Sequence, residues 1–281
     1  MLVRLWHALP FTGDPAPVVN QIPLQGTITP AARAGGKVLN LASLEQPLRQ
    51  AFTAGRPRAV VLGINSPGGS PVQSRMILQR IRDLSEEHNV PVIAHIEDIG
   101  ASGGYMIALA GDEIYADPFG IVGSIGVIAG GFGFNEAIAK LGIERRVYTA
   151  GENKSQLDPF KPEDPEDVSR LQNLLEKSHK AFVDLVKSRR GNRLKSPDDV
   201  LFQGEFWLAP DALEHGLIDG AEDLRAMLRR RFGDRVNIRR IEADRKGMLS
   251  RLLSSALGGV FGPDELLGAM ERQSLWSRFG R

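Results

Sequence analysis

The chain has 281 residues, of which 42% are hydrophobic and 25% are charged, with 31 Gly, 17 Pro and no Cys. This composition excludes collagen-like, low-complexity and wholly disordered proteins, and the lack of Cys excludes disulfides, thiolate nucleophiles and cysteine-ligated metal sites. No two of the five His have the i, i+4 spacing of a helical metal site, so no protein-built transition-metal site is expected. We also expect no cofactor. The net charge is +1, but residues 225–281 hold thirteen Lys or Arg against six Asp or Glu, which leaves the first 224 residues at −6.

Residues 1–19 are expected to form an N-terminal extension. They contain one early Arg and a short apolar stretch broken by Pro10, which is not typical of a signal peptide. No window of the chain reaches 18 consecutive apolar residues, the length typical of a membrane-spanning helix. We therefore expect a cytoplasmic protein, at most peripheral at the inner membrane.

The central part of the sequence alternates between strand and helix patterns. Residues 58–65 form a β-branched apolar run, which predicts a buried strand, and the Ser-Pro-Gly-Gly that follows predicts a tight turn. Apolar residues at helical spacing predict a helix over residues 70–88, and a second strand is expected at 90–96. The sequence then predicts a glycine turn at 100–104, a helix start at 105–109, and strands at 113–116, 122–129 and 145–149.

A charged helix is predicted at residues 165–190, ended by Gly191, and a shorter helix from residue 211 ends at Gly216. Strand, turn and helix repeated in this way are typical of parallel βαβ units. Ligands and catalytic groups gather at the carboxyl ends of parallel strands. Both glycine-rich turns are therefore predicted at one edge of the sheet.

Residues 225–281 form a basic tail. Such a tail can bind an anionic membrane or nucleic acid, and it can equally be the solvated surface of a helix. Residues 248–261 within it are amphipathic and can lie on a membrane or on a neighbouring subunit. We expect membrane-surface contact through the basic tail and no nucleic-acid partner.

The strongest local motif is Gly100-Ala101-Ser102-Gly103-Gly104, at a predicted strand-to-helix turn. Its glycines allow a sharp turn that leaves the Ser102 hydroxyl exposed at the start of the helix. The unpaired N–H groups there favour negative charge, which suits the oxyanion of a tetrahedral intermediate. The structural alternative is an N-cap serine in a glycine turn.

A serine nucleophile needs a base, and three candidates follow Ser102 in the sequence. His179 falls in the charged helix, and His215 lies at a helix end, where a cation is favourable for structural reasons alone. Lys154 follows a predicted strand, among small polar residues. Because the ordinary pKa of a lysine is about 10.4, only burial in a dry cleft makes a lysine a base. Lys154 is the preferred candidate, and an exposed loop lysine is the structural alternative.

The turn around Pro67, Gly68 and Gly69 ends the preceding parallel strand. Pro67 fixes φ and the two glycines free the backbone, so that N–H groups can point into a cleft. This turn can supply a second oxyanion donor beside that of Gly103. Its spacing does not match a phosphate-binding loop, so no nucleotide site is expected.

Several motifs in one order resemble the S49 peptidase family, which includes signal peptide peptidase A, protease IV and SohB-like proteins. The matching text is INSPGG at 64–69, GASGGYMIA at 100–108, VGSIGVI at 122–128, GENKS at 151–155 and ALEHGLID at 212–219. The resemblance covers residues 20–222 and assigns residues 20–224 to an S49-type peptidase domain. It implies an α/β fold of the ClpP/crotonase type, built from stacked ββα units, with a helical C-terminal extension.

The resemblance also implies a serine peptidase with a Ser–Lys dyad. The implied roles are nucleophile for Ser102, general base for Lys154, oxyanion donors for Gly69 and Gly103, turn formation for Gly68 and orientation of the lysine for Ser124. Ser124 can also be a simple turn serine between strands. The implied substrates are signal peptides and other unfolded apolar peptides, and the implied assembly is a homo-oligomeric ring.

Two other functions stay open. A crotonase-like acyl-CoA enzyme would share the fold and the oxyanion turns, with Glu97 and Glu152 as the nearest carboxylates, but it would leave Ser102 without a role. A non-catalytic ring-forming scaffold that recruits partners through the basic tail would need neither Ser102 nor Lys154. Binding of coenzyme A would favour the first alternative, and cleavage of peptides would argue against both.

Overall fold

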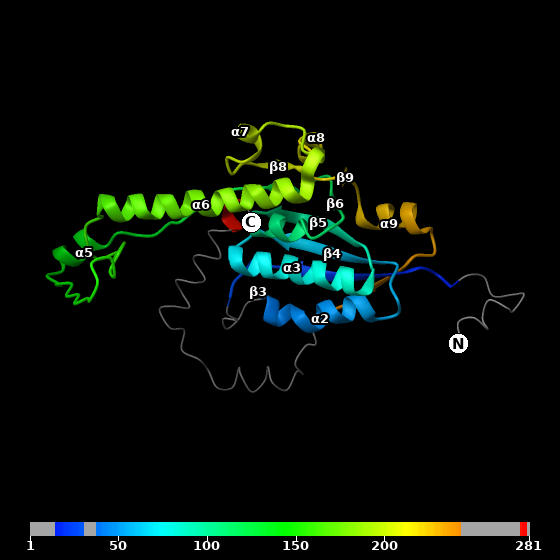
Figure 1. Ribbon diagram of the computed structural model, residues 1–281, viewed down its shortest axis with the longest axis horizontal. Helices are drawn as coiled ribbons and strands as arrows, with labels where there is room; N and C mark the ends of the chain where they lie inside the picture. Colours follow the sequence, from blue (N-terminus) through cyan, green and yellow to red (C-terminus); the bar gives the residue numbers. More distant parts are fainter. Residues whose placement is uncertain (1–14, 31–37, 243–275, 280–281) are drawn as a thin grey trace, which may run out of the picture.

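The computed structural model describes residues 15–30, 38–242 and 276–279, and the helices and strands are labelled in Figure 1. Most of the N-terminal extension and residues 248–261 of the basic tail lie outside the described residues. The centre of the fold is an eight-stranded sheet with the strand order β10-β1-β4-β5-β6-β9, to which β7 and β8 are added beside β5. Of the helices in the described ranges, none combines the length and apolarity that a bilayer crossing demands.

The strands of the main sheet run parallel, and only β8 is antiparallel to its neighbour, β7. Their carboxyl ends therefore meet at one edge, which carries both glycine turns. The strands are β1 (Val18–Gln25), β4 (Ala59–Ser66), β5 (Val92–Ala101), β6 (Glu113–Ala116), β7 (Ile121–Gly123), β8 (Phe206–Leu208), β9 (Gly220–Ala221) and β10 (Asn237–Arg240), with β2 (Thr27–Ile28) and β3 (Val38–Leu39) in a separate small sheet.

Helices cover both faces of the sheet. The larger apolar core lies under α2, α3, α4 and the second half of α6, and the smaller one joins α9 to the opposite face through Met227 and Leu228. The helices are α2 (Leu41–Thr53), α3 (Pro71–His88), α4 (Gly103–Ala108), α5 (Asn135–Lys140), α6 (Pro165–Arg190), α7 (Asp198–Leu201), α8 (Ala209–Glu214) and α9 (Leu224–Phe232), with a 3-10 turn at Gly191–Arg193.

The predicted α/β organisation is confirmed, and so are most of the predicted elements. The predicted strands at 58–65 and 113–116 are β4 and β6, and the predicted helices at 70–88 and 165–190 are α3 and α6. The strand predicted at 122–129 is present only in its first residues, as β7, because Gly123 and Ser124 have positive φ, 115° and 52°, which ends the extended backbone. The strand predicted at 145–149 is wrong, since these residues form no strand.

The helical C-terminal extension expected after residue 224 is only partly helical. α9 is followed by β10, which pairs in parallel with β1, so the sheet continues to residue 240. The sequence does not indicate this strand, because Ile238 is the only apolar residue among its four. Arg230 pairs with Glu222, and Arg231 pairs with Glu113 at 2.6 Å, so the fold neutralises part of the charge of the basic tail.

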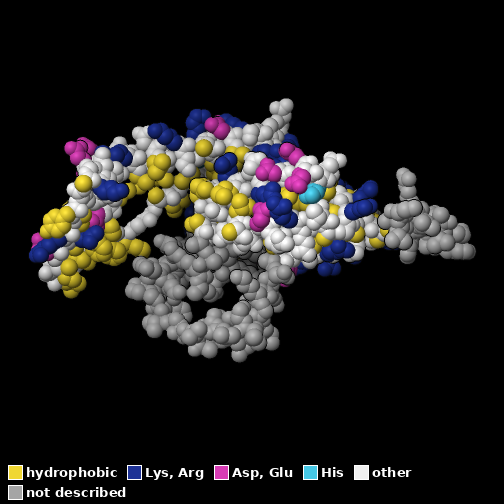
Figure 2. All heavy atoms as spheres, turned by 60° about the horizontal axis from the view of Figure 1, so that its bottom comes forward, with side chains coloured by type: hydrophobic (Ala, Val, Ile, Leu, Met, Phe, Trp, Pro, Cys, Tyr) yellow, Lys and Arg dark blue, Asp and Glu magenta, His cyan; other side chains and the backbone are white. Residues whose placement is uncertain are grey.

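Residues 126–164, which we call the arm, project from the sheet between β7 and α6 (Figure 1). No residue of the arm is buried. The buried residues of α6 all lie in its second half, so its first half extends outward with the arm. Figure 2 shows hydrophobic side chains gathered on the arm. The large exposed ones are Ile128, Phe132, Phe134, Leu141, Ile143, Tyr148, Leu157 and Phe160.

A buried arginine fixes the inner end of α6. Arg190 is 2% exposed, and its guanidinium donates to the Gly216 carbonyl at 2.8 and 2.9 Å and to the two carboxylate oxygens of Asp219 at 2.8 and 3.0 Å. Burial by itself raises the pKa of Asp219, but the hydrogen bonds from Arg190 and from the Ile114 N–H hold that pKa below its ordinary value. This ion pair therefore fixes the direction in which α6 leaves the body.

Replacing Arg190 with Ala is expected to lower the free energy of unfolding by about 3 kcal/mol, because the partly buried Asp219 loses its partner. The loss should shrink as the pH falls from about 4, the ordinary range of an aspartate, through the lowered pKa of Asp219. Urea unfolding measures both effects. The matched control in α6 is Lys180→Ala, which removes an exposed ion pair with Asp184 and is expected to change little. Equal losses in the two variants would contradict the anchoring role.

Candidate active site

Ser102 lies in a sharp turn between β5 and α4. Its φ of 50° and ψ of −119° are unusual for a residue that has a Cβ. Its N–H donates to the Gly123 carbonyl at 2.8 Å, and its carbonyl accepts from the Met106 N–H at 2.9 Å. The Ser102 side chain makes no capping hydrogen bond, so the hydroxyl does not serve as a helix cap.

The second glycine turn lies directly against Ser102. A Cβ added to Gly68 would lie 2.8 Å from the Gly103 nitrogen and 2.9 Å from the Ser102 Cβ. A Cβ added to Gly103 would lie 3.3 Å from the Gly69 nitrogen. The close approach of the two turns thus depends on glycine at these positions.

Ile28 holds this second turn in place through its backbone. The Ile28 N–H donates to the Gly68 carbonyl at 2.9 Å, and the Ile28 carbonyl accepts from the Ser70 N–H at 2.8 Å. The two bonds thus join Ile28 to the residues before and after Gly69, which makes Ile28 and Gly69 a parallel bridge pair. In such a pair the N–H of the bridged residue, here Gly69, points away from the partner strand. The Gly69 N–H is therefore turned away from Ile28.

Two backbone N–H groups next to Ser102 are available to a ligand. In the part of the chain that the structure describes, neither the Gly69 N–H nor the Gly103 N–H donates a hydrogen bond within the protein. Gly103 opens α4, where the first N–H groups have no partner inside the helix. A pair of free N–H groups beside a hydroxyl can stabilise the oxyanion of an acyl-transfer reaction.

Ser124 is also close to the Ser102 turn, because it follows Gly123, the residue that accepts the Ser102 N–H. It is 5% exposed with a φ of 52°, and its N–H donates to the Glu205 carbonyl at 2.6 Å. The structure therefore places five of the predicted site residues around one turn, namely Gly68, Gly69, Ser102, Gly103 and Ser124.

Lys154 is not part of this group. It lies exposed in a turn of the arm, where its N–H donates to the Gly151 carbonyl at 3.3 Å. The arm projects away from the sheet (Figure 1), so the structure does not bring Lys154 together with Ser102. The two carboxylates of the acyl-CoA alternative are not brought together either. Glu97 lies on β5, where its carboxylate accepts from the Gln25 amide at 3.2 Å, whereas Glu152 is exposed in the arm.

The contacts of His215 are typical of a residue that stabilises the fold. Its Nδ1 lies 2.8 Å from the Ser196 hydroxyl, and its ring packs edge-on against Trp207 with centroids 4.9 Å apart. His179 lies on α6, as predicted. The preference for Lys154 over these histidines stays a prediction.

Two residues of the site were missed by the sequence analysis. Ile28 positions the Gly68–Gly69 turn and Glu205 positions Ser124, and both act through backbone carbonyl or N–H groups. A backbone contact places no demand on the type of side chain. No local pattern in the sequence could therefore have identified either residue.

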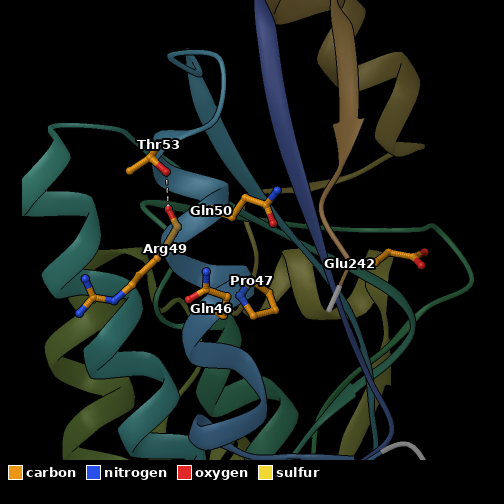
Figure 3. A pocket seen from close by; sticks show the side chains of 6 residues that line it. All are labelled: Gln46, Pro47, Arg49, Gln50, Thr53 and Glu242. Atoms are coloured by element: carbon orange, nitrogen blue, oxygen red, sulfur yellow. Dashed lines mark hydrogen bonds between the residues drawn. The ribbon is translucent and has the colours of Figure 1, made fainter. Parts of the chain in front are cut away.

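A pocket lies elsewhere, on the outer face of α2 (Figure 3). Its wall is polar, and Thr53 within it donates to the Arg49 carbonyl at 2.9 Å. The pocket contains none of the predicted site residues, so it is separate from the Ser102 turn. The residues that line it are Gln46, Pro47, Arg49, Gln50, Thr53 and Glu242.

Comparison with curated proteins gives relatives with two kinds of name. The chain is 47% identical over 268 residues to a Na(+)/H(+) antiporter NhaA of Brucella abortus, across 92% of this chain but 36% of that protein. It is 36% identical over 176 residues to Protease 4 of Haemophilus influenzae, across 61% of this chain and 28% of that protein. The chain thus spans about a third of the length of these relatives, and the antiporter name describes a much longer protein.

Comparison with solved structures supports the fold. The membrane-bound stomatin-specific protease 1510-N matches 80% of this chain and 98% of its own length, with a TM-score of 0.50 and 17% sequence identity. The predicted ClpP-like α/β fold is confirmed.

The model of Peptidase family S49 matches residues 85–232, which is more than half of the chain and includes Ser102, Ser124 and Lys154. The matched range also spans the arm and α6. The chain belongs to peptidase family S49.

Proposed function

We propose that this chain is a serine endopeptidase that uses Ser102 as nucleophile and Lys154 as general base. The observation that carries the proposal is the strained Ser102 turn, which lies beside the free N–H groups of Gly69 and Gly103. A strained nucleophile turn next to two unpaired donors suits acyl transfer. Membership of a peptidase family makes a peptide the natural acyl donor.

In the proposed reaction the Ser102 Oγ attacks the carbonyl carbon of a peptide bond, and its proton passes to the neutral Lys154 amine. The N–H groups of Gly69 and Gly103 donate to the oxyanion of the tetrahedral intermediate. Lys154 then returns the proton to the leaving amine as the C–N bond breaks. Water, deprotonated by the same amine, hydrolyses the acyl-enzyme and restores Ser102.

Lys154 reaches the nucleophile from a neighbouring copy in this proposal. The arm has no buried residue, yet it exposes large apolar side chains, including Tyr148 at 91%. Apolar surface on this scale favours contact with another protein surface. A head-to-tail contact in which the arm of one copy lies across the Ser102 turn of the next would bury this surface and exclude water from the lysine. Repeated around a closed ring, the contact would complete every site.

The proposed substrates are signal peptides and other unfolded apolar peptides, and the proposed location is the cytoplasm or the periphery of the inner membrane. The exposed apolar residues of β8, Phe206 and Leu208, lie close to the nucleophile turn and suit apolar side chains. Membrane contact through the basic tail stays a prediction, because residues 243–275 lie outside the described residues. The acyl-CoA and scaffold alternatives have no supporting observation comparable to the Ser102 turn.

Ser102→Ala and Lys154→Ala are each expected to reduce cleavage of unfolded casein and of a fluorogenic apolar peptide by at least about 10³-fold. Lys154→Arg should be as inactive as Lys154→Ala, because a guanidinium stays protonated and cannot act as a base. Lys140→Ala, which removes another lysine of the arm, is the matched control and should retain activity. Full activity in Ser102→Ala would place the chemistry elsewhere, and full activity in Lys154→Arg would exclude the lysine as base.

Gly68→Ala is expected to lower kcat by about 10²-fold, the usual cost of losing one oxyanion donor. The added methyl group would press on the Gly103 nitrogen and on Ser102. Gly233→Ala is the matched control, because Gly233 also has a positive φ, 88°, but has open space around its Cβ position. If kcat falls equally in both variants, the loss reflects backbone strain and not the oxyanion donors.

A further inference from the structure

An aromatic contact joins residues 276–279 to β8. The rings of Phe279 and Phe206 lie edge to face, with centroids 5.0 Å apart and an interplanar angle of 64°. The Phe279 N–H donates to the Trp276 carbonyl at 3.0 Å, which closes the segment into a turn. Trp276 and Phe279 are partly buried while the two residues between them are exposed, and Phe279 is the one whose ring lies against Phe206. In Figure 1 this turn, in red, lies within the outline of the body.

The contact is close to the nucleophile turn. Phe206 pairs with Gly123 across the ladder between β7 and β8, and the Gly123 carbonyl accepts the Ser102 N–H. Glu205, one residue before Phe206, accepts the N–H of Ser124. Phe279 therefore lies against the strand that holds the candidate site together.

The surface under Phe279 is apolar. Phe206 and Leu208 are 43% and 48% exposed, and alternation along a strand places them on the same face of β8. Trp207 lies on the other face and packs against His215. Phe279 occupies part of this apolar face, which lies next to the Ser102 turn.

We propose that residues 276–279 form an autoinhibitory contact, in which Phe279 competes with the apolar side chains of peptides for the Phe206 face of β8. The proposal rests on the proposed function, because it names a regulator of that same site. The contact touches none of the reacting groups. Its removal should therefore strengthen peptide binding and leave the chemical step unchanged.

The test measures peptide binding without cleavage, in the Ser102→Ala background of the full chain. The affinity of a fluorescein-labelled apolar peptide is compared, by anisotropy, between Ser102→Ala alone and the same variant with Phe279→Ala. We expect Phe279→Ala to tighten binding about two- to tenfold, the range that one aromatic pair contributes. A polar peptide of equal length should show no change.

Arg278→Ala in the same background is the matched control, because Arg278 lies in the same turn and is exposed. Equal affinities in all three proteins, weaker binding in Phe279→Ala, or no binding of the apolar peptide by any of them would overturn the proposal. Tighter binding in Phe279→Ala combined with no cleavage by the wild-type protein would instead count against the proposed function alone.

Discussion

The hydrogen bond from the Ser102 N–H to the Gly123 carbonyl is the interaction on which the candidate site depends. A residue with a Cβ adopts a φ of 50° only where its surroundings hold it there. β7 supplies the carbonyl, and β7 is itself held between the end of β5 and β8. β8 thus supports the Ser102 turn, although no residue of β8 is proposed to react.

The same constraint explains why the two glycine turns lie in contact. With Ser102 turned by β7, the Gly103 nitrogen faces the Gly68–Gly69 turn at a distance that no side chain on Gly68 would permit. Ile28 fixes the second turn from the opposite side. The proposed nucleophile and both proposed oxyanion donors are thereby preorganised within one copy, whereas the proposed base lies on the arm that α6 and Arg190 hold outward.

The parts of this structure that follow from local sequence were predictable. Apolar spacing predicts the strand at residues 58–65 and the helix at residues 70–88, and the glycines around Ser102 indicate a sharp turn. The parts that depend on distant pairing were not. β10 contains two arginines and one isoleucine, and its partner strand, β1, is distant in the sequence. Residues 145–149 have strand-like composition but no partner strand, and composition alone cannot reveal this.

In the proposed assembly the Ser102 turn of one copy receives Lys154 from another, and complementation between two inactive variants tests this arrangement most directly. Ser102→Ala and Lys154→Ala chains are produced separately and then together in one cell, and peptide cleavage is measured for each preparation. If the dyad forms between copies, the co-produced protein should recover a measurable fraction of wild-type activity, because some contacts pair an intact Ser102 with an intact Lys154. No recovery, in co-produced protein shown to contain both variants in one assembly, would contradict the claim.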